Sequence, residues 1–129
     1  MQHSILQGRL ILLVEDELLI AMEVTRELET SGASVIMTGD LQEALLLTDS
    51  TKLAGAILDH GLPDGDSSLL RDRLNERGIP FLNYSASAAA EDGTDGSVHL
   101  SKPAAEGLLT ATLATLINMQ DCAASKYDT

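Results

Sequence analysis

Five polar residues in this sequence stand at or just beyond the end of a short apolar run, and together they suit phosphoryl-transfer chemistry. They are Glu15, Asp16, Asp59, Ser85 and Lys102. Two carboxylates about 4 Å apart repel by roughly 4 kcal/mol at an effective dielectric near 20, so three brought together need positive charge. One lysine is not enough, whereas Mg²⁺ accepts one or two carboxylates together with phosphate oxygens. Because a carboxylate is also a competent nucleophile, the group predicts Mg²⁺-assisted transfer of a phosphoryl group to an acid.

The apolar runs themselves predict the elements that would bring these residues together. Between the runs lie segments that favour helices, so strand and helix alternate along the chain. This alternation predicts an α/β fold with a doubly wound, five-stranded parallel sheet. The carboxyl ends of parallel strands share one edge of a sheet, where α/β proteins bind their ligands. The expected strands are LILLV (10–14), SVIM (34–37), LAGAIL (53–58), PFLNY (80–84) and VHL (98–100).

Helix signals follow several of these runs. In the first connecting segment Leu18, Met22 and Leu28 are spaced to lie near one face, which we expect to be buried. Gly32 and Gly78 end the first and third connecting segments, as glycine commonly does at helix C-termini.

The fourth connection differs from the others. Residues 85–97, SASAAAEDGTDGS, are small and glycine-containing, so we expect the fourth helix to be short or irregular. We expect one domain over residues 8–120, with flexible tails at 1–7 and 121–129.

Composition excludes several functional classes. A net charge of −12 without a Lys/Arg cluster argues against nucleic acid and against anionic membrane surfaces as partners. The single cysteine excludes a disulfide framework and a cysteine-based metal site within one chain. The sequence contains neither a signal-peptide pattern nor an apolar run long enough to span a membrane, so we expect a cytoplasmic protein.

Four motifs, each following an apolar run, resemble the receiver domain of two-component response regulators. The resemblance covers about residues 8–120, and RGIPFL (77–82) also resembles stand-alone, single-domain receivers. It implies the flavodoxin-like (βα)5 fold. The motifs are VEDE (14–17), LDHGLPDG (58–65), YSA (84–86) and LSKP (100–103).

The resemblance implies a role for each site residue. Asp59 would be the phosphoacceptor and would also contact Mg²⁺. Glu15 and Asp16 match the acid pair that holds Mg²⁺, and the backbone carbonyl of Gly61 would complete the protein's share of the metal ligands.

Three further residues would act on or respond to the phosphoryl group. Lys102 would pair with its oxygens, and Ser85 would donate a hydroxyl to it and couple phosphorylation to loop movement. His99 occupies the place where receivers commonly carry an aromatic that swings inward on activation, so it is a candidate switch.

The implied partners are a histidine kinase or histidine phosphotransfer protein, which supplies the phosphoryl group, and a downstream protein that receives the signal. A dimer is compatible with the sequence. An alternative is a receiver-fold binding module that acts without phosphorylation; the chain could also be a receiver piece of a hybrid histidine kinase or of a larger regulator.

An enzyme alternative also exists, because phosphatases of the haloacid-dehalogenase type use an aspartate nucleophile. They place a second acid two residues after it, whereas this chain has Gly61 there. We therefore expect a phosphoacceptor with at most slow autodephosphorylation.

Overall fold

The computed structural model describes residues 6–58, 68–85, 98–102 and 107–127; for Ser85, His99, Ser101 and 121–127 it describes the backbone alone. Five strands form one sheet in the order β2-β1-β3-β4-β5, and every pair of neighbours is parallel. This confirms the predicted sheet. The strands are β1 (Leu10–Val14), β2 (Ser34–Thr38), β3 (Gly55–Leu58), β4 (Phe81–Ser85) and β5 (Val98–Ser101).

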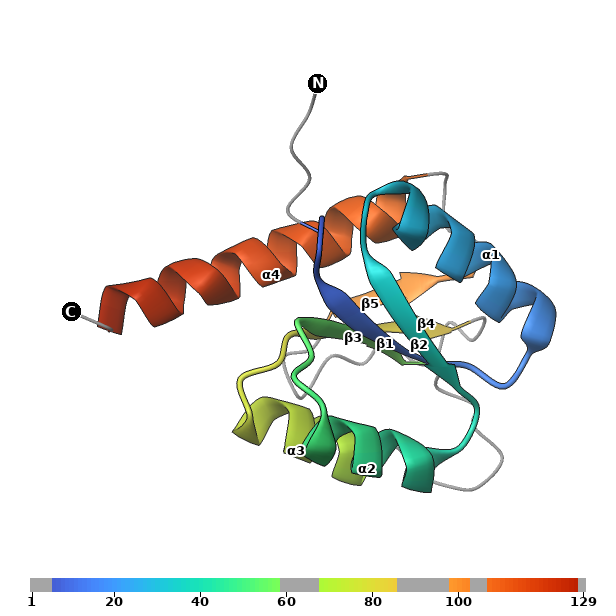
Figure 1. Cartoon of the computed structure of the whole chain (residues 1–129), viewed down its shortest axis with the longest axis horizontal. Helices are drawn as coiled ribbons and strands as arrows, with labels where there is room; N and C mark the ends of the chain where they lie inside the picture. The colour runs from blue at the N-terminus through green and yellow to red at the C-terminus, as the bar shows by residue number, and fades with distance from the viewer. Residues whose placement is uncertain (1–5, 59–67, 86–97, 103–106, 128–129) are drawn as a thin grey trace.

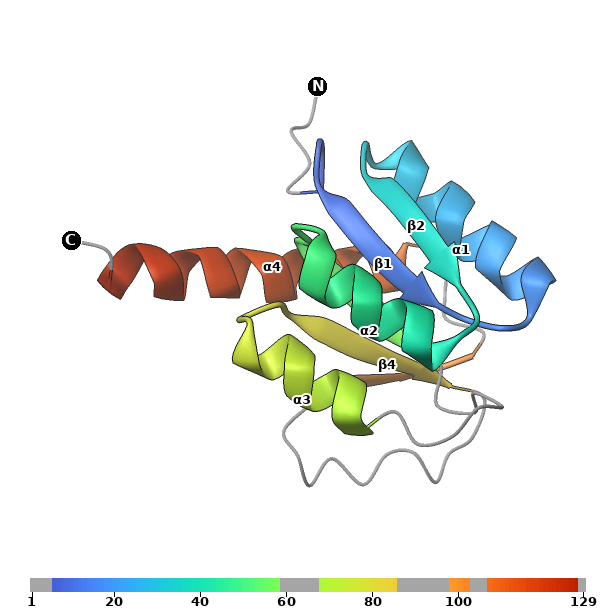
Figure 2. The ribbon, with the colours of Figure 1, turned by 60° about the horizontal axis from the view of Figure 1, so that its bottom comes forward.

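Helices cover both faces of the sheet. Figure 1 shows α1 and α4 on one face and α2 and α3 on the other, and Figure 2 brings the α2–α3 layer forward. The fold is therefore doubly wound, as the alternation of strand and helix predicts. The helices in the described part of the chain are α1 (Leu18–Thr30), α2 (Leu41–Ser50), α3 (Ser68–Glu76) and α4 (Leu108–Tyr127).

The central strands separate two hydrophobic clusters. In β1, Ile11 and Leu13 join the cluster with α1 and α4, whereas Leu12 and Val14 join the cluster with α2 and α3. Successive side chains of a strand point to opposite faces, so a strand covered on both faces is apolar throughout. This is why β1 and β3 appear in the sequence as continuous apolar runs.

Local signals at the helix ends behave as their chemistry predicts. Gly32 follows α1 with φ at 94° and Gly78 follows α3 with φ at 69°, a backbone region that costs glycine little. At the start of α2, the Asp40 side chain accepts a hydrogen bond from the backbone N–H of Gln42 at 3.0 Å. The two glycines mark where α1 and α3 end, and the hydrogen bond to Asp40 marks where α2 begins.

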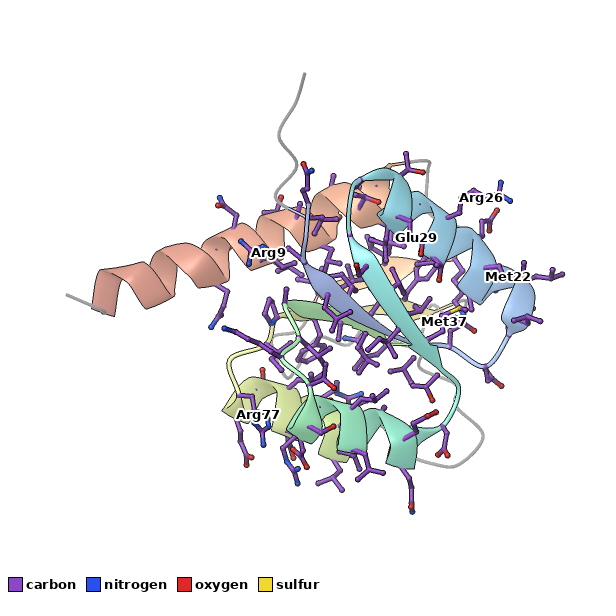
Figure 3. The ribbon with its side chains drawn as sticks, in the orientation of Figure 1. Arg9, Met22, Arg26, Glu29, Met37 and Arg77 are labelled. Atoms are coloured by element: carbon purple, nitrogen blue, oxygen red, sulfur yellow. The ribbon has the colours of Figure 1, made fainter. Side chains whose placement is uncertain are left out.

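The predicted buried face of α1 is partly wrong. Leu28 is buried, but Leu18 and Met22 are 65% and 52% exposed, and Figure 3 shows Met22 projecting away from the sheet. The face that packs on the sheet carries the smaller Ala21 and Val24 together with Leu28. Met22 lies about 100° round the helix from Ala21, so it cannot share that face.

Both segments that we expected to be tails contain residues that the structure describes. Leu6, which we expected in the N-terminal tail, is fully buried in the cluster beneath α1 and α4. At the other end, α4 remains helical to Tyr127, past the expected limit at residue 120. The predicted short or irregular fourth helix falls on residues 86–97, which lie outside the described residues.

Candidate functional site

The predicted site residues follow strands that end at one edge of the sheet. Val14, the last residue of β1, is in register with Leu58, the last residue of β3. Likewise Ser85, which ends β4, pairs with Ser101, which ends β5. The residues that follow these four strands therefore start from a common edge.

The seven predicted site residues are described to different extents. For Glu15, Asp16 and Lys102 the structure gives side chains, and they lie directly after β1 and β5. The others are Ser85 and His99, described by backbone alone within β4 and β5, and Asp59 and Gly61, which lie outside the described residues.

Glu15 and Lys102 form a buried ion pair. The Nζ atom of Lys102 donates to Oε1 of Glu15 at 2.7 Å, and the two side chains are 9% and 2% exposed, the lysine being the more accessible. The second carboxylate oxygen, Oε2, accepts from the backbone N–H of Glu17 at 3.2 Å, just before α1 begins. The pair thus ties the start of α1 to the segment that follows β5.

This ion pair extends across the edge of the sheet. Strands β3 and β4 lie between β1 and β5, so Glu15 and Lys102 start from strands three steps apart, which is roughly 14 Å at the usual strand spacing. To meet at 2.7 Å, the two side chains must reach over the ends of β3 and β4. Asp59 is bonded directly to Leu58, the last residue of β3.

Lys102 also contacts an aromatic ring that the sequence prediction missed. Its Nζ atom lies over the ring of Tyr84, 5.6 Å from the ring centroid, at a distance where a cation is attracted to the ring face. Tyr84 is buried and directly precedes Ser85. The position of Tyr84 before a strand-end serine was visible in the sequence, but its contact with Lys102, the residue that follows the next strand, was not.

Asp16 has a different environment from Glu15. It is exposed and has no hydrogen-bond or ion-pair partner within the described part of the chain. Gly39, also missed by the sequence prediction, packs closely against it: a Cβ atom there would stand 3.1 Å from Asp16 Cα and 3.2 Å from Asp16 Cβ. A side chain at position 39 would therefore push on the Asp16 backbone.

These donors suit a hard divalent cation. Asp16 offers an exposed carboxylate and Glu15 a second one beside it, and Mg²⁺ binds through oxygen with one or two protein carboxylates. The described residues do not include three grouped His, Cys, Asp or Glu side chains that could hold a metal by themselves. The two acids fit magnesium as part of a site that needs a further oxygen donor.

Comparison with known proteins gives the family. No protein-family model matches the chain. The KDP operon transcriptional regulatory protein KdpE of Escherichia coli K12 is 37% identical over 111 residues, which is 80% of this chain and 48% of KdpE. The chain thus spans about half the length of this relative. A response regulator receiver protein from Sinorhizobium medicae has a similar structure, with a TM-score of 0.78, 23% identity, and coverage of 89% of this chain and 98% of that one.

The chain is similar to response-regulator receiver domains in fold, and to the response regulator KdpE in sequence over 111 residues. A further similar structure is the receiver domain of the sensor histidine kinase PA1611 from Pseudomonas aeruginosa PAO1, which contains a magnesium ion in its active-site cleft. Its TM-score is 0.74 at 24% identity, over 86% of this chain and 98% of that one. The sequence prediction of the family is confirmed.

The described part of the chain lacks any helix whose length and apolar character would allow it to cross a membrane.

A second charged cluster joins α2 to α3, two helices that lie on the same face of the sheet in Figure 2. There Asp49 accepts from Nη1 of Arg73 at 2.5 Å and from Nε of Arg77 at 3.1 Å. The hydrogen bond from Arg73, together with the positive charges of both arginines, holds the pKa of Asp49 below its ordinary value of 3.8. This cluster joins two helices and is separate from the candidate site.

Proposed function

We propose that this receiver domain accepts a phosphoryl group from the phosphohistidine of a kinase or phosphotransfer protein onto Asp59. A carboxylate oxygen of Asp59 attacks phosphorus, the phosphorus–nitrogen bond breaks, and the histidine nitrogen leaves with the bonding electron pair, to be protonated. The product is an aspartyl phosphate. The observation that supports the proposal is the Glu15–Lys102 pair, which reaches over the end of β3, the strand to which Asp59 is bonded.

Each remaining predicted site residue has a part in this proposal. Bound Mg²⁺ would neutralise charge on the transferring group, held by Asp16, Glu15, Asp59 and the carbonyl of Gly61. Asp16 is the more accessible of the two acids after β1, because Glu15 is buried against Lys102.

Lys102 would have to exchange a carboxylate partner for phosphoryl oxygens. Its ammonium lies at the edge of the sheet where β3, the strand that Asp59 follows, also ends. Ser85, as the last residue of β4, would donate its hydroxyl to the same phosphoryl group. His99, in β5, is proposed as the switch; unchanged partner affinity of His99→Ala with and without a phosphoryl mimic would remove that role.

We further propose that the domain acts in the cytoplasm and passes its signal by protein–protein contact, either alone or as a dimer. Direct contact with nucleic acid is disfavoured by the net charge of −12. The domain is expected to be a phosphoacceptor and not a multiple-turnover enzyme.

Mass spectrometry of the intact chain tests the proposal. With Mg²⁺ and a small phosphodonor such as acetyl phosphate, wild type should gain one phosphoryl group, and Asp59→Asn should gain none. Asp64→Asn, a neutralised acid in the same segment, is the matched control and should still be phosphorylated. An unmodified wild type would favour the phosphorylation-independent binding module, and rapid turnover of phosphate esters would favour the phosphatase alternative.

A further inference from the structure

The ring of Tyr84 lies between the candidate site and a groove on one face of the molecule. One neighbour of the ring is the ammonium of Lys102, 5.6 Å from the centroid. Tyr84 also lines a groove of about 690 Å³ between α1 and α4. A single side chain that is 7% exposed therefore contacts both features.

Two helices that are hydrogen-bonded to each other, α1 and α4, form the walls of the groove. Glu23 and Glu27 of α1 line one wall, and Leu109 and Thr110 of α4 line the other. Across it, Oε2 of Glu27 accepts from the hydroxyl of Thr110 at 2.7 Å and from its backbone N–H at 3.3 Å. These hydrogen bonds join α1 to α4, and residues of both helices pack in the same buried hydrophobic cluster as Tyr84, so a shift of the Tyr84 ring acts on both walls of the groove.

Two contacts of Lys102 with described residues are attractions of different kinds. One is the carboxylate of Glu15 and the other is the face of the Tyr84 ring. A cation at a ring face is attracted by the negative face of the ring, and more strongly where it is removed from water. If Lys102 moves to a phosphoryl group, the ring loses the cation that now stands over it.

We propose that Tyr84 couples the position of Lys102 to the groove between α1 and α4, so that phosphorylation at Asp59 alters this groove. This inference rests on the proposed function. An aromatic residue that responds to phosphorylation would then lie in β4, at Tyr84, in addition to the switch predicted at His99 in β5. The groove is then a surface whose shape depends on the phosphorylation state.

The chain provides its own probe for this coupling. It contains two tyrosines and no tryptophan, so Tyr127→Phe leaves Tyr84 as the sole tyrosine fluorophore. Tyrosine emission of this variant should change when Mg²⁺ and beryllofluoride are added, in proportion to the beryllofluoride bound. The ¹⁹F resonance of bound beryllofluoride measures that occupancy independently. In Tyr127→Phe/Lys102→Met, which lacks the cation over the ring, the emission change should be lost when the two variants are compared at equal ¹⁹F-measured occupancy by beryllofluoride.

Hydrogen exchange locates the response. On beryllofluoride binding, amide exchange in residues 23–30 and 108–114 should change in wild type and in Tyr84→Phe, which keeps the ring, but not in Tyr84→Leu. Circular dichroism checks that Tyr84→Leu is folded. If it is not, tyrosine emission of Tyr127→Phe at a measured occupancy by beryllofluoride decides the matter, because unchanged emission with bound beryllofluoride overturns the coupling.

The outcomes separate the two proposals. Absence of bound beryllofluoride in wild type would overturn the proposed function and this inference with it. Bound beryllofluoride without any change in Tyr84 emission, or with equal exchange changes in Tyr84→Leu and wild type, would overturn the inference and leave the phosphoacceptor proposal intact.

Discussion

Replacing Lys102 with methionine should destabilise the domain, because it leaves the Glu15 carboxylate buried without its ammonium partner. At the observed 2.7 Å, the attraction between the two charges is about 6 kcal/mol at an effective dielectric near 20. Part of this offsets the cost of removing both ions from water, and deleting one partner of a buried pair typically costs about 3–5 kcal/mol. Because Lys102 is 9% exposed and water can still reach it, we expect a loss of about 2–4 kcal/mol.

Denaturant and thermal unfolding in chelator measure this loss. For a chain of this length, a loss of about 3 kcal/mol corresponds to a drop in Tm of roughly 10 °C. Lys52→Met is the matched control: Lys52 is exposed, and its replacement should change the free energy of unfolding by less than about 0.5 kcal/mol.

A double-mutant cycle with Glu15→Gln isolates the pair. Glu15→Gln/Lys102→Met should be more stable than Lys102→Met, because the double variant no longer buries an unpaired carboxylate at position 15. The reasoning is refuted if Lys102→Met is as stable as Lys52→Met, or if the double variant loses the sum of the two single losses.

Three further predictions concern charges and buried polar atoms elsewhere. Asp59→Asn should stabilise the metal-free protein by about 1–3 kcal/mol through relief of like-charge repulsion, and a clear fall in Tm in chelator would contradict the clustered-acid site. Asp49, whose pKa Arg73 holds below the ordinary value of 3.8, contributes stability that is complete above pH 3.8 and is lost as the pH falls through the lowered pKa. The difference in Tm between wild type and Asp49→Asn should therefore be small but constant near neutral pH and shrink at pH values below 3.8; a difference that grows on acidification would show the sign to be wrong. Thr25→Val should leave the free energy of unfolding unchanged or raise it by roughly 1 kcal/mol in urea titrations, because the buried Thr25 hydroxyl has no hydrogen-bond partner in the described part of the chain, and a loss larger than that would reveal a partner.

Most of the fold could be predicted because its causes are local in the sequence. A strand covered on both faces must be apolar throughout, and this property marks β1 and β3 directly. Gly32 and Gly78 end helices because their positive φ disfavours other residues. The face of α1 was harder to predict, because the sequence offers large apolar residues such as Met22 on a side where the sheet does not lie.

The site could be predicted as a group of residues but not as a set of contacts. The parallel order of the strands is enough to bring Glu15 and Lys102 to one edge. Which acid the lysine contacts depends on side-chain reach between residues 87 positions apart, and local patterns hold no information on it. The contact of Tyr84 with Lys102 is hidden from the sequence for the same reason.

The length of α4 determines how far its last residues lie from the edge of the sheet that carries Glu15 and Lys102. Its 20 residues span about 30 Å, whereas a five-residue strand spans about 17 Å. By Ile117 the helix already packs beside Gly55, the first residue of β3, and so stands at the opposite end of the sheet from Glu15 and Lys102. Figure 1 shows α4 continuing outward from there. A fluorophore or affinity tag joined beyond α4 would therefore leave the edge that carries Glu15 and Lys102 uncovered. A chain immobilised by its C-terminus could then be used to capture the proposed phosphotransfer partners.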